Sequence, residues 1–181
     1  MKKILAFIGS PNQNGRTAAF VKEVVRGAEN VGASAKIYYM NNMDIKYCQG
    51  CMHCRIEGQG CILKDDMQEV YREFMEADAI ILGSPIYVLQ ISAQMKVLFD
   101  RLCALLGRNL EPSWDSKKVV MVYSQGVADP KAFEAYFRIN EVVVKKFGLE
   151  LIDTIVYAGY EEDRKSEFLA RAFRAGEALT K

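Results

Sequence analysis

Four cysteines lie within fourteen residues of this chain, in the pattern Cys48-x2-Cys51-x2-Cys54-x6-Cys61. Only one further cysteine, Cys103, occurs among the 181 residues, so the clustering calls for a chemical reason. A cysteine binds metals and attacks electrophiles as its thiolate. Four thiols in one segment can therefore hold a metal ion or a cluster, form a disulfide or carry out redox chemistry, depending on what the rest of the chain provides.

Length, charge and the amino terminus limit the class of protein. A chain of 181 residues is long enough for one domain with a substantial core, so we expect a single domain over residues 1–181. The net charge of +1 gives no electrostatic basis for binding nucleic acid. The apolar run before Gly9 is too short for a signal peptide or a membrane span, so we expect a cytoplasmic protein with no membrane partner. Structural disulfides are rare in that compartment, which favours a metal or redox role for the cysteines.

Short apolar runs alternate with helical patterns along the chain. Five runs are expected to be strands: 4–8, 37–40, 79–82, 119–123 and 151–156. The first, third and fourth are continuously apolar, as in parallel strands that are covered on both faces. Helices are expected between the strands, including one that is bounded by Asp129-Pro130 and Gly148. The alternation predicts an α/β fold with a doubly wound, five-stranded parallel sheet.

In this arrangement the cysteine-rich loop, residues 44–64, is an insertion after the second strand. It would leave the sheet at its carboxyl end, which is the edge where open α/β sheets bind ligands. We therefore expect the cysteines to lie at the ligand-binding edge.

The loop after the first strand, Gly9–Thr17, has the composition of a phosphate site. Backbone N–H groups at a helix N-terminus bind phosphate well, and Gly15 permits close approach. The loop is neither a Walker A sequence nor a G-x-G-x-x-G dinucleotide fingerprint. It fits a terminal phosphate monoester, and the alternative is a plain turn in which Thr17 caps the helix.

Two further loops, 83–87 and 123–126, follow the third and fourth strands. Together with the first loop they can enclose a flat ring and its phosphate tail, because the carboxyl ends of parallel strands meet at one edge. Ser84-Pro85 favours extended backbone, and Tyr87 provides an aromatic face.

Four stretches of the chain, taken together, resemble a known family. Four stretches carry the resemblance: Gly-Ser-Pro-x-x-x-Gly-Arg-Thr, the cysteines running into Asp65-Asp66-Met67, residues 77–87, and Lys96-x2-Phe99-Asp100-Arg101. They resemble the NADPH-dependent FMN reductases, and within them most closely the iron–sulfur flavoproteins, over about residues 3–126. The resemblance implies a flavodoxin-like fold with strand order 2-1-3-4-5. It also implies bound FMN and a homodimer or tetramer, with the Asp100-Arg101 helix at the interface.

The resemblance also assigns site residues. No side chain is expected to act as a catalytic acid or base, because the flavin carries the chemistry. By this resemblance, the residues that bind the FMN phosphate are Ser10, Pro11, Asn12, Asn14, Gly15, Arg16 and Thr17. Those along the ring and ribityl chain are Ser84, Pro85, Ile86 and Tyr87. The third loop contributes Ser124, Gln125 and Gly126.

Four interpretations of the cysteines remain open. A [4Fe–4S] cluster takes four thiolates, and repeated C-x2-C steps are the usual bacterial starting pattern, so Cys48, Cys51, Cys54 and Cys61 are candidate ligands. The other interpretations are a zinc ion, a redox-active thiol pair such as Cys51 with Cys54, and a lid over the flavin with free thiols. Cys103 is expected to be a buried hydrophobe on its helix.

The sequence thus predicts an FMN-dependent oxidoreductase or electron-transfer flavoprotein that carries a [4Fe–4S] cluster. Its expected electron partners are ferredoxin, NAD(P)H as co-substrate, and a small-molecule acceptor. The alternatives are an NAD(P)H-dependent FMN or quinone reductase without a cluster, a thiol-based redox sensor, and a phosphate-binding protein without flavin.

Overall fold

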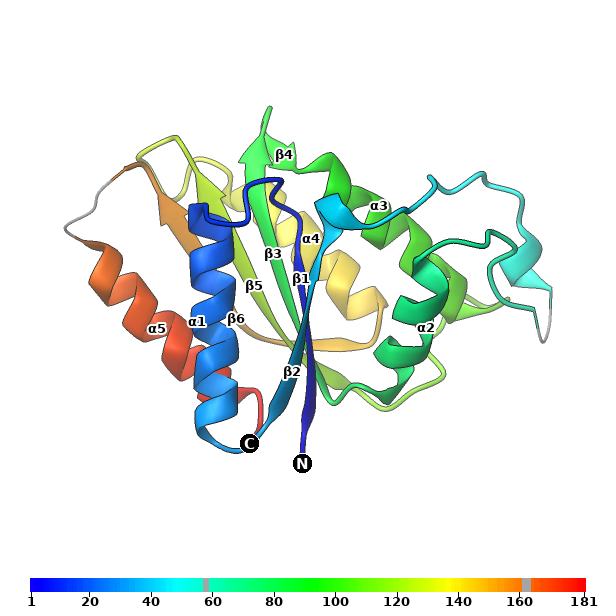
Figure 1. Cartoon of the computed structure of the whole chain (residues 1–181). Helices are drawn as coiled ribbons and strands as arrows, with labels where there is room; N and C mark the ends of the chain where they lie inside the picture. The colour runs from blue at the N-terminus through cyan, green and yellow to red at the C-terminus, as the bar shows by residue number, and fades with distance from the viewer. Residues whose placement is uncertain (57–58, 161–163) are drawn as a thin grey trace.

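The structure is a computed structural model of the chain and describes residues 1–56, 59–160 and 164–181. Its centre is a twisted parallel sheet (Figure 1). The strands of the main path run in the order β2-β1-β3-β5-β6. Their bounds are β1 Lys3–Ile8, β2 Ser34–Tyr39, β3 Ala79–Tyr87, β5 Lys117–Gln125 and β6 Leu149–Ala158. The predicted doubly wound α/β architecture is confirmed.

The prediction of a five-stranded sheet is wrong by one strand. In the described part of the chain a sixth strand, β4 (Gln90–Ile91), folds back antiparallel onto the end of β3. The order therefore reads β2-β1-β3-β5-β6 with β4 off the path. It differs from the predicted 2-1-3-4-5 through the added β4, since the five parallel strands keep the predicted neighbours. A strand of two residues is too short to produce an alternating pattern, so the sequence gives no signal for it.

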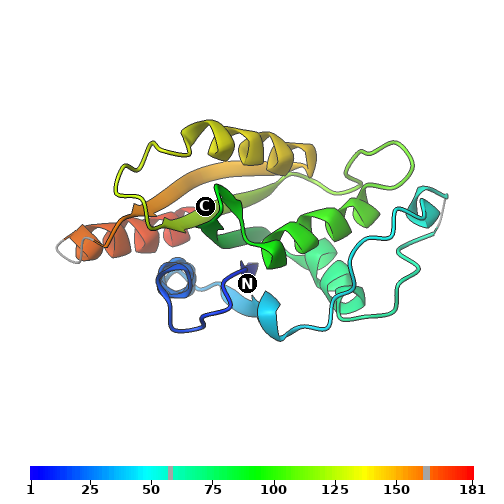
Figure 2. The same cartoon turned by 90° about the horizontal axis from the view of Figure 1, so that it is seen from above.

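Two layers of helices cover the sheet (Figure 2). On one face α1 (Arg16–Asn30) and α5 (Lys165–Ala178) pack together, and on the other lie α2 (Met67–Glu76), α3 (Ala93–Leu102) and α4 (Glu134–Lys146). Each layer closes its own buried apolar cluster against the sheet, as strands that are apolar on both faces require. No helix of the described residues is long and apolar enough to cross a bilayer.

The ends of α4 test the predicted capping signals. The Gly148 prediction is confirmed, because Gly148 follows the helix with a φ of +65°, a conformation that side chains disfavour. The predicted start at Asp129-Pro130 is wrong. The Asp129 carboxylate accepts a hydrogen bond from the Lys131 N–H at 2.9 Å, which forms a local turn, and the helix begins only at Glu134.

Three short 3-10 turns complete the architecture: η1 (Met40–Asn42), η2 (His53–Arg55) and η3 (Cys103–Leu106). The turn η1 follows β2 directly, and the chain then runs outward past α3. It carries η2 to the C-terminal side of α3, where η2 packs beside η3. This path decides where the cysteines lie.

Candidate functional site

The loop between β1 and α1 leaves the first turn of α1 without a side-chain cap. The N-cap residue is Gly15, and no side-chain hydrogen bond caps the helix there. Asn12 shapes the loop instead: its Oδ1 accepts from the Asn14 N–H at 3.0 Å and its carbonyl accepts from the Gly15 N–H at 3.1 Å. A Cβ on Gly15 would sit 3.2 Å from Asn12. The loop thus leads into a helix start whose amides have no side-chain cap, which is the kind of site that binds anions.

The loop does contain a turn at Asn12–Gly15, but Thr17 does not cap the helix, so that part of the alternative is wrong. Its hydroxyl lies 2.6 Å from the Ser124 hydroxyl at the end of β5, in a buried contact that joins the first and third predicted loops. Ser10 is also buried, and its Oγ accepts from the Asn12 N–H at 3.2 Å. The hydroxyls of both residues are therefore held in place by the protein.

Arg16 is turned toward β6. Its guanidinium lies over the Tyr160 ring, 4.1 Å from the centroid, and donates to the Gly159 carbonyl. Gly159 and Tyr160 were not predicted as site residues, because they follow the last strand, about 140 residues after the loop. The structure brings them to the same edge.

A buried serine that the sequence analysis missed joins the first two loops. The Ser92 hydroxyl donates to the Gly9 carbonyl at 2.7 Å and accepts from the Met95 N–H at 3.2 Å, so it also caps α3. The Ser92 N–H donates to the Ser84 hydroxyl at 2.9 Å. The Ser84 hydroxyl in turn donates to the Pro85 carbonyl, so it is already hydrogen-bonded within the protein. A serine directly before an apolar helical stripe was the signal that could have found Ser92.

Removing the Ser92 hydroxyl should lower the stability of the protein. We expect Ser92→Ala to lower the free energy of unfolding by about 1–3 kcal/mol, because it removes an N-cap and leaves the Gly9 carbonyl without its buried donor. Urea denaturation measures the change. Ser116→Ala, at an exposed position before β5, is the matched control and should change stability by less than about 0.5 kcal/mol. Equal stability of Ser92→Ala and the wild type would contradict the role of this hydroxyl.

The third loop contains a buried amide with a spare acceptor. The Gln125 Nε2 donates to the carbonyls of Val127 at 3.1 Å and Asp129 at 2.7 Å. Its Oε1 is buried and has no hydrogen-bond partner among the described residues. Gly126 is exposed beside it. A buried oxygen without a donor is costly, so this atom suits a ligand N–H or O–H.

The β3–β4 hairpin carries exposed apolar side chains over this edge. Tyr87 is 51% exposed, Val88 94% and Leu89 65%. Val88 and Leu89 both have positive φ, 46° and 68°, which is the backbone of a tight hairpin turn that normally contains Asn-Gly. A β-branched residue there is strained, and such strain is concentrated at functional sites.

This strain can be measured. We expect the double substitution Val88→Asn with Leu89→Gly to raise the free energy of unfolding by about 1–2 kcal/mol, because Asn and Gly tolerate positive φ. Thermal unfolding of the double variant and the wild type gives the difference. A lower melting temperature in the double variant would contradict the interpretation of these two residues as strained.

The four clustered cysteines and Cys103 line one pocket, with about 500 Å³ of empty space including its open mouth. Cys48 and Cys51 are exposed, and Cys54, Cys61 and Cys103 are half-buried. Within the described ranges, no three His, Cys, Asp or Glu side chains gather closely enough to hold one metal ion. Cys103 was expected to be a buried hydrophobe, and this is only partly correct. It packs on the core, burial raises the pKa of its thiol, and it also lines the pocket.

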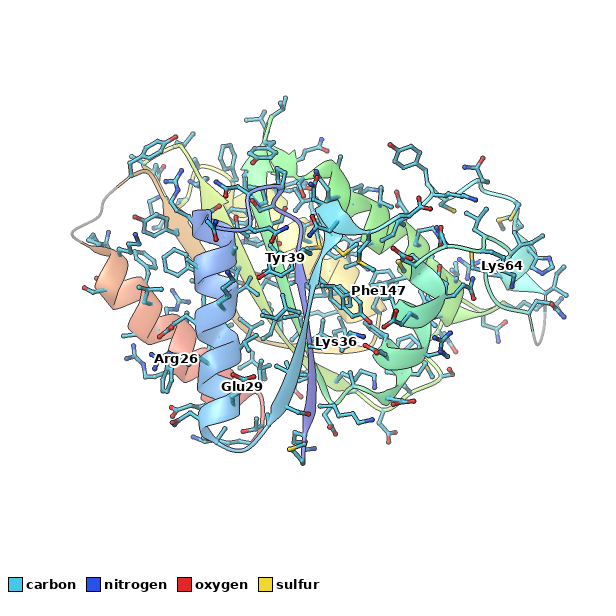
Figure 3. The ribbon with its side chains drawn as sticks, viewed as in Figure 1. Arg26, Glu29, Lys36, Tyr39, Lys64 and Phe147 are labelled. Atoms are coloured by element: carbon cyan, nitrogen blue, oxygen red, sulfur yellow. The ribbon has the colours of Figure 1, made fainter. Side chains whose placement is uncertain are left out.

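The pocket does not lie at the carboxyl edge of the sheet, so this expectation is wrong. Asp100, Arg101 and Cys103 at the C-terminal end of α3 form its wall, whereas Ser92 at the N-terminal end of α3 contacts the β1 loop. Ten residues of helix separate the two ends by about 15 Å. In Figure 3, Lys64 of the cysteine-rich loop lies far from Tyr39, the last residue of β2. The cysteine pocket therefore does not cover the β1 loop, where the resemblance places the FMN phosphate.

That the Asp100-Arg101 helix lies at a subunit interface stays a prediction, and the two side chains that mark it differ in exposure. Asp100 is exposed and pairs with Lys96, but the Arg101 side chain is 1% exposed and pairs inside its own chain with Asp65. Burial alone would raise the pKa of Asp65, but hydrogen bonds from Arg101 and from the Lys46 amide hold it below its usual value. Arg101 thus belongs to the interior beside the cysteine pocket.

Comparisons with known proteins agree on a family. The model of the family described as NADPH-dependent FMN reductase matches residues 2–142. An iron-sulfur flavoprotein of Archaeoglobus fulgidus is 33% identical over 149 residues, which cover 81% of this chain and 64% of that protein. FMN-dependent NADH:quinone oxidoreductase 2 of Pseudomonas aeruginosa is 31% identical over 121 residues, which cover 59% of this chain and 58% of that protein. The chain thus spans less than two thirds of the length of these relatives.

Solved structures agree on the fold. An NAD(P)H:quinone oxidoreductase from Methanothermobacter marburgensis superposes with a TM-score of 0.75 over 100% of this chain and 98% of that chain. At 18% identity this likeness shows a common, flavodoxin-like fold and nothing finer. The match to the family model covers most of the sequence and includes all three loops at the sheet edge. This chain belongs to the NADPH-dependent FMN reductase family.

Proposed function

We propose that this chain is an oxidoreductase that binds FMN at the carboxyl edge of its sheet. The observation that supports this most directly is the uncapped first turn of α1, where Thr17 contacts Ser124 of the third loop. The loop before this turn is joined to Ser92 through the Gly9 carbonyl. The flavin would supply the hydride and electron-transfer chemistry, and the protein would supply binding, orientation and electrostatics. Residues 1–181 would act as one FMN-binding domain.

The residues at this edge fit FMN. The phosphate would take the amides at the start of α1, assisted by Asn12, Asn14 and Thr17. The isoalloxazine ring would lie along Pro85–Tyr87, where Tyr87 is half exposed. The buried Oε1 of Gln125 would accept a hydrogen bond from the ligand. Ser84, Ser92 and Ser124 would hold the three loops and would not donate to the cofactor.

The electron donor that we propose is NAD(P)H and the acceptor a quinone or another small molecule. The support is the NADH:quinone oxidoreductase of Pseudomonas aeruginosa among the sequence relatives. The open hairpin beside the ring site leaves space for a second flat molecule to stack there. We propose that the protein acts in the cytoplasm as a homodimer or tetramer.

Binding and turnover test this proposal separately. Purified protein should bind FMN on titration and oxidise NADH or NADPH when a quinone is added. Riboflavin should bind more weakly than FMN, because it lacks the phosphate that the α1 turn would hold. No FMN binding would overturn the assignment of the site. FMN binding without NAD(P)H oxidation, but with reduction by ferredoxin, would make the protein an electron carrier.

A second function, which we also propose, is that the cysteine pocket holds a [4Fe–4S] cluster. All four candidate ligands line one pocket, and among the described residues they do not converge on one point as a single zinc ion requires. A cluster presents its irons on separate corners, so its ligands stay further apart. The name of the Archaeoglobus fulgidus relative supports the same assignment. The cluster would add a site for one-electron transfer, with ferredoxin as a partner.

Anaerobic reconstitution with iron and sulfide tests the cluster. About four iron atoms per chain and a broad absorption shoulder on the flavin spectrum are expected. Flavin bands with no bound iron would leave the alternative reductase without a cluster. Reversible formation of a Cys51–Cys54 disulfide, with no iron bound, would instead support the thiol-based sensor.

A further inference from the structure

The two ends of the cysteine-rich loop are bound to each other. The Asp44 N–H donates to the Asp66 carboxylate at 2.7 Å, and the Asp66 N–H donates to the Asp44 carbonyl at 3.1 Å. One step further in, the Lys46 N–H donates to the Asp65 carboxylate at 3.0 Å. The loop thus has a closed base, and its cysteines lie between residues 46 and 65.

Arg101, from α3, binds both sides of this closed base. The side chains of Arg101 and Asp65 are 1% and 0% exposed. Nη1 of Arg101 donates to Asp65 Oδ2 at 2.5 Å and to the Lys46 carbonyl at 2.6 Å, and Nη2 donates to Asp65 Oδ1 at 2.9 Å. The guanidinium therefore binds both ends of the loop, with the planar two-point geometry that only arginine provides.

The remaining donors of Arg101 are also used. Nε donates to the Tyr71 hydroxyl at 3.2 Å, and Nη2 reaches the Cys61 Sγ at 3.5 Å. A guanidinium has five N–H groups, and five acceptors surround this one: two carboxylate oxygens, a carbonyl, a hydroxyl and a sulfur. One N–H of a saturated, buried cation is thus directed at the sulfur of a candidate metal ligand.

We propose that Arg101 is a positioning residue for the cysteine pocket: it closes the base of the loop and fixes Cys61 Sγ through a charged hydrogen bond. The second part rests on the proposed cluster. A permanent positive charge beside a metal–thiolate group favours its more negative, reduced state, and hydrogen bonds to the sulfurs act in the same direction. Arg101 would therefore raise the reduction potential of the group that the thiolates hold.

The closed base is tested by hydrogen exchange on protein without added iron. We compare wild type, Arg101→Gln, Arg101→Lys and, as the matched control, Arg138→Gln, whose arginine is exposed on α4 and pairs with Glu134. Exchange in peptides that cover residues 44–66 should become about 10- to 100-fold faster in both Arg101 variants. Peptides from β1 and α1 should be unchanged, and Arg138→Gln should match the wild type throughout. Unchanged exchange at 44–66 would overturn the closed base.

The effect on the metal group is tested by redox potentiometry on reconstituted protein, with the FMN potential measured in the same sample as an internal reference. Arg101→Gln should shift the cluster potential to more negative values and leave that of FMN unchanged, and Arg101→Lys, which keeps the charge, should shift it less. Tyr71→Phe is the milder variant for the case that Arg101→Gln does not fold, and it should speed exchange at 44–66 to a smaller degree. Iron bound with an identical potential in all variants would overturn the inference and leave the cluster proposal standing. No iron in the wild type would overturn the cluster and the Cys61 part, while hydrogen exchange still decides the closed base.

Discussion

Asn12→Asp is expected to weaken FMN binding by about 10- to 100-fold, because it places a negative charge in the loop proposed to hold the phosphate. The change is nearly isosteric. The Asn12 Oδ1 that accepts from the Asn14 N–H is kept as a carboxylate oxygen, so the loop should keep its shape. The position is exposed, and no buried group is lost. Fluorescence titration of FMN into the two proteins measures the difference.

Riboflavin is the control for this prediction. It has the same ring and ribityl chain but no phosphate, so Asn12→Asp should bind it as well as the wild type does. The melting temperature without ligand should also agree within error. Equal loss of FMN and riboflavin would place the effect outside the phosphate site, and unchanged FMN binding would contradict the phosphate assignment.

Cys54→Ala is expected to abolish stable iron binding, from about four iron atoms per chain to less than about one, because each of the four irons of the cluster takes one cysteine thiolate. Cys54 is half-buried in η2 and lines the pocket beside the other three candidate ligands. Iron and sulfide analysis after anaerobic reconstitution gives the result.

The fifth cysteine provides the matched control. Cys103 lines the same pocket but lies outside the spacing pattern, on the helix wall. Cys103→Ala should therefore keep the iron content of the wild type. Loss of iron in both variants would show that the ligand set is not the one proposed. Iron retained in Cys54→Ala would contradict the cluster on these four cysteines.

Local patterns were sufficient for most of the architecture. Continuous apolar runs such as those of β1 and β3 can only be satisfied between two helical layers, and the structure has that arrangement. Gly148 was predictable because only glycine takes positive φ without strain at the end of α4. The start of α4 was not, since Asp129 serves equally well as a helix cap and as the first residue of a turn.

The candidate site, too, has features that local patterns predict and features that they do not. The loops at 9–17, 83–87 and 123–126 follow strands, and the carboxyl ends of parallel strands share an edge, so their meeting could be inferred. Ser92 and the Arg16–Tyr160 contact could not, because each joins residues that are far apart in the chain. Such contacts depend on which rotamers the packed neighbours leave open.

By itself, the sequence determined that four thiols stay within one short segment, that this segment follows the second strand, and that a phosphate-type loop follows the first. Covalent spacing and strand topology set these facts before any packing. Only the tertiary structure decided that the cysteines lie at the C-terminal end of α3, about 15 Å from the N-terminal end that contacts the β1 loop. The physical reason is the buried Arg101–Asp65 pair. Through Arg101, residues 46, 61 and 65 are bound to α3, a helix that begins 28 positions after Asp65.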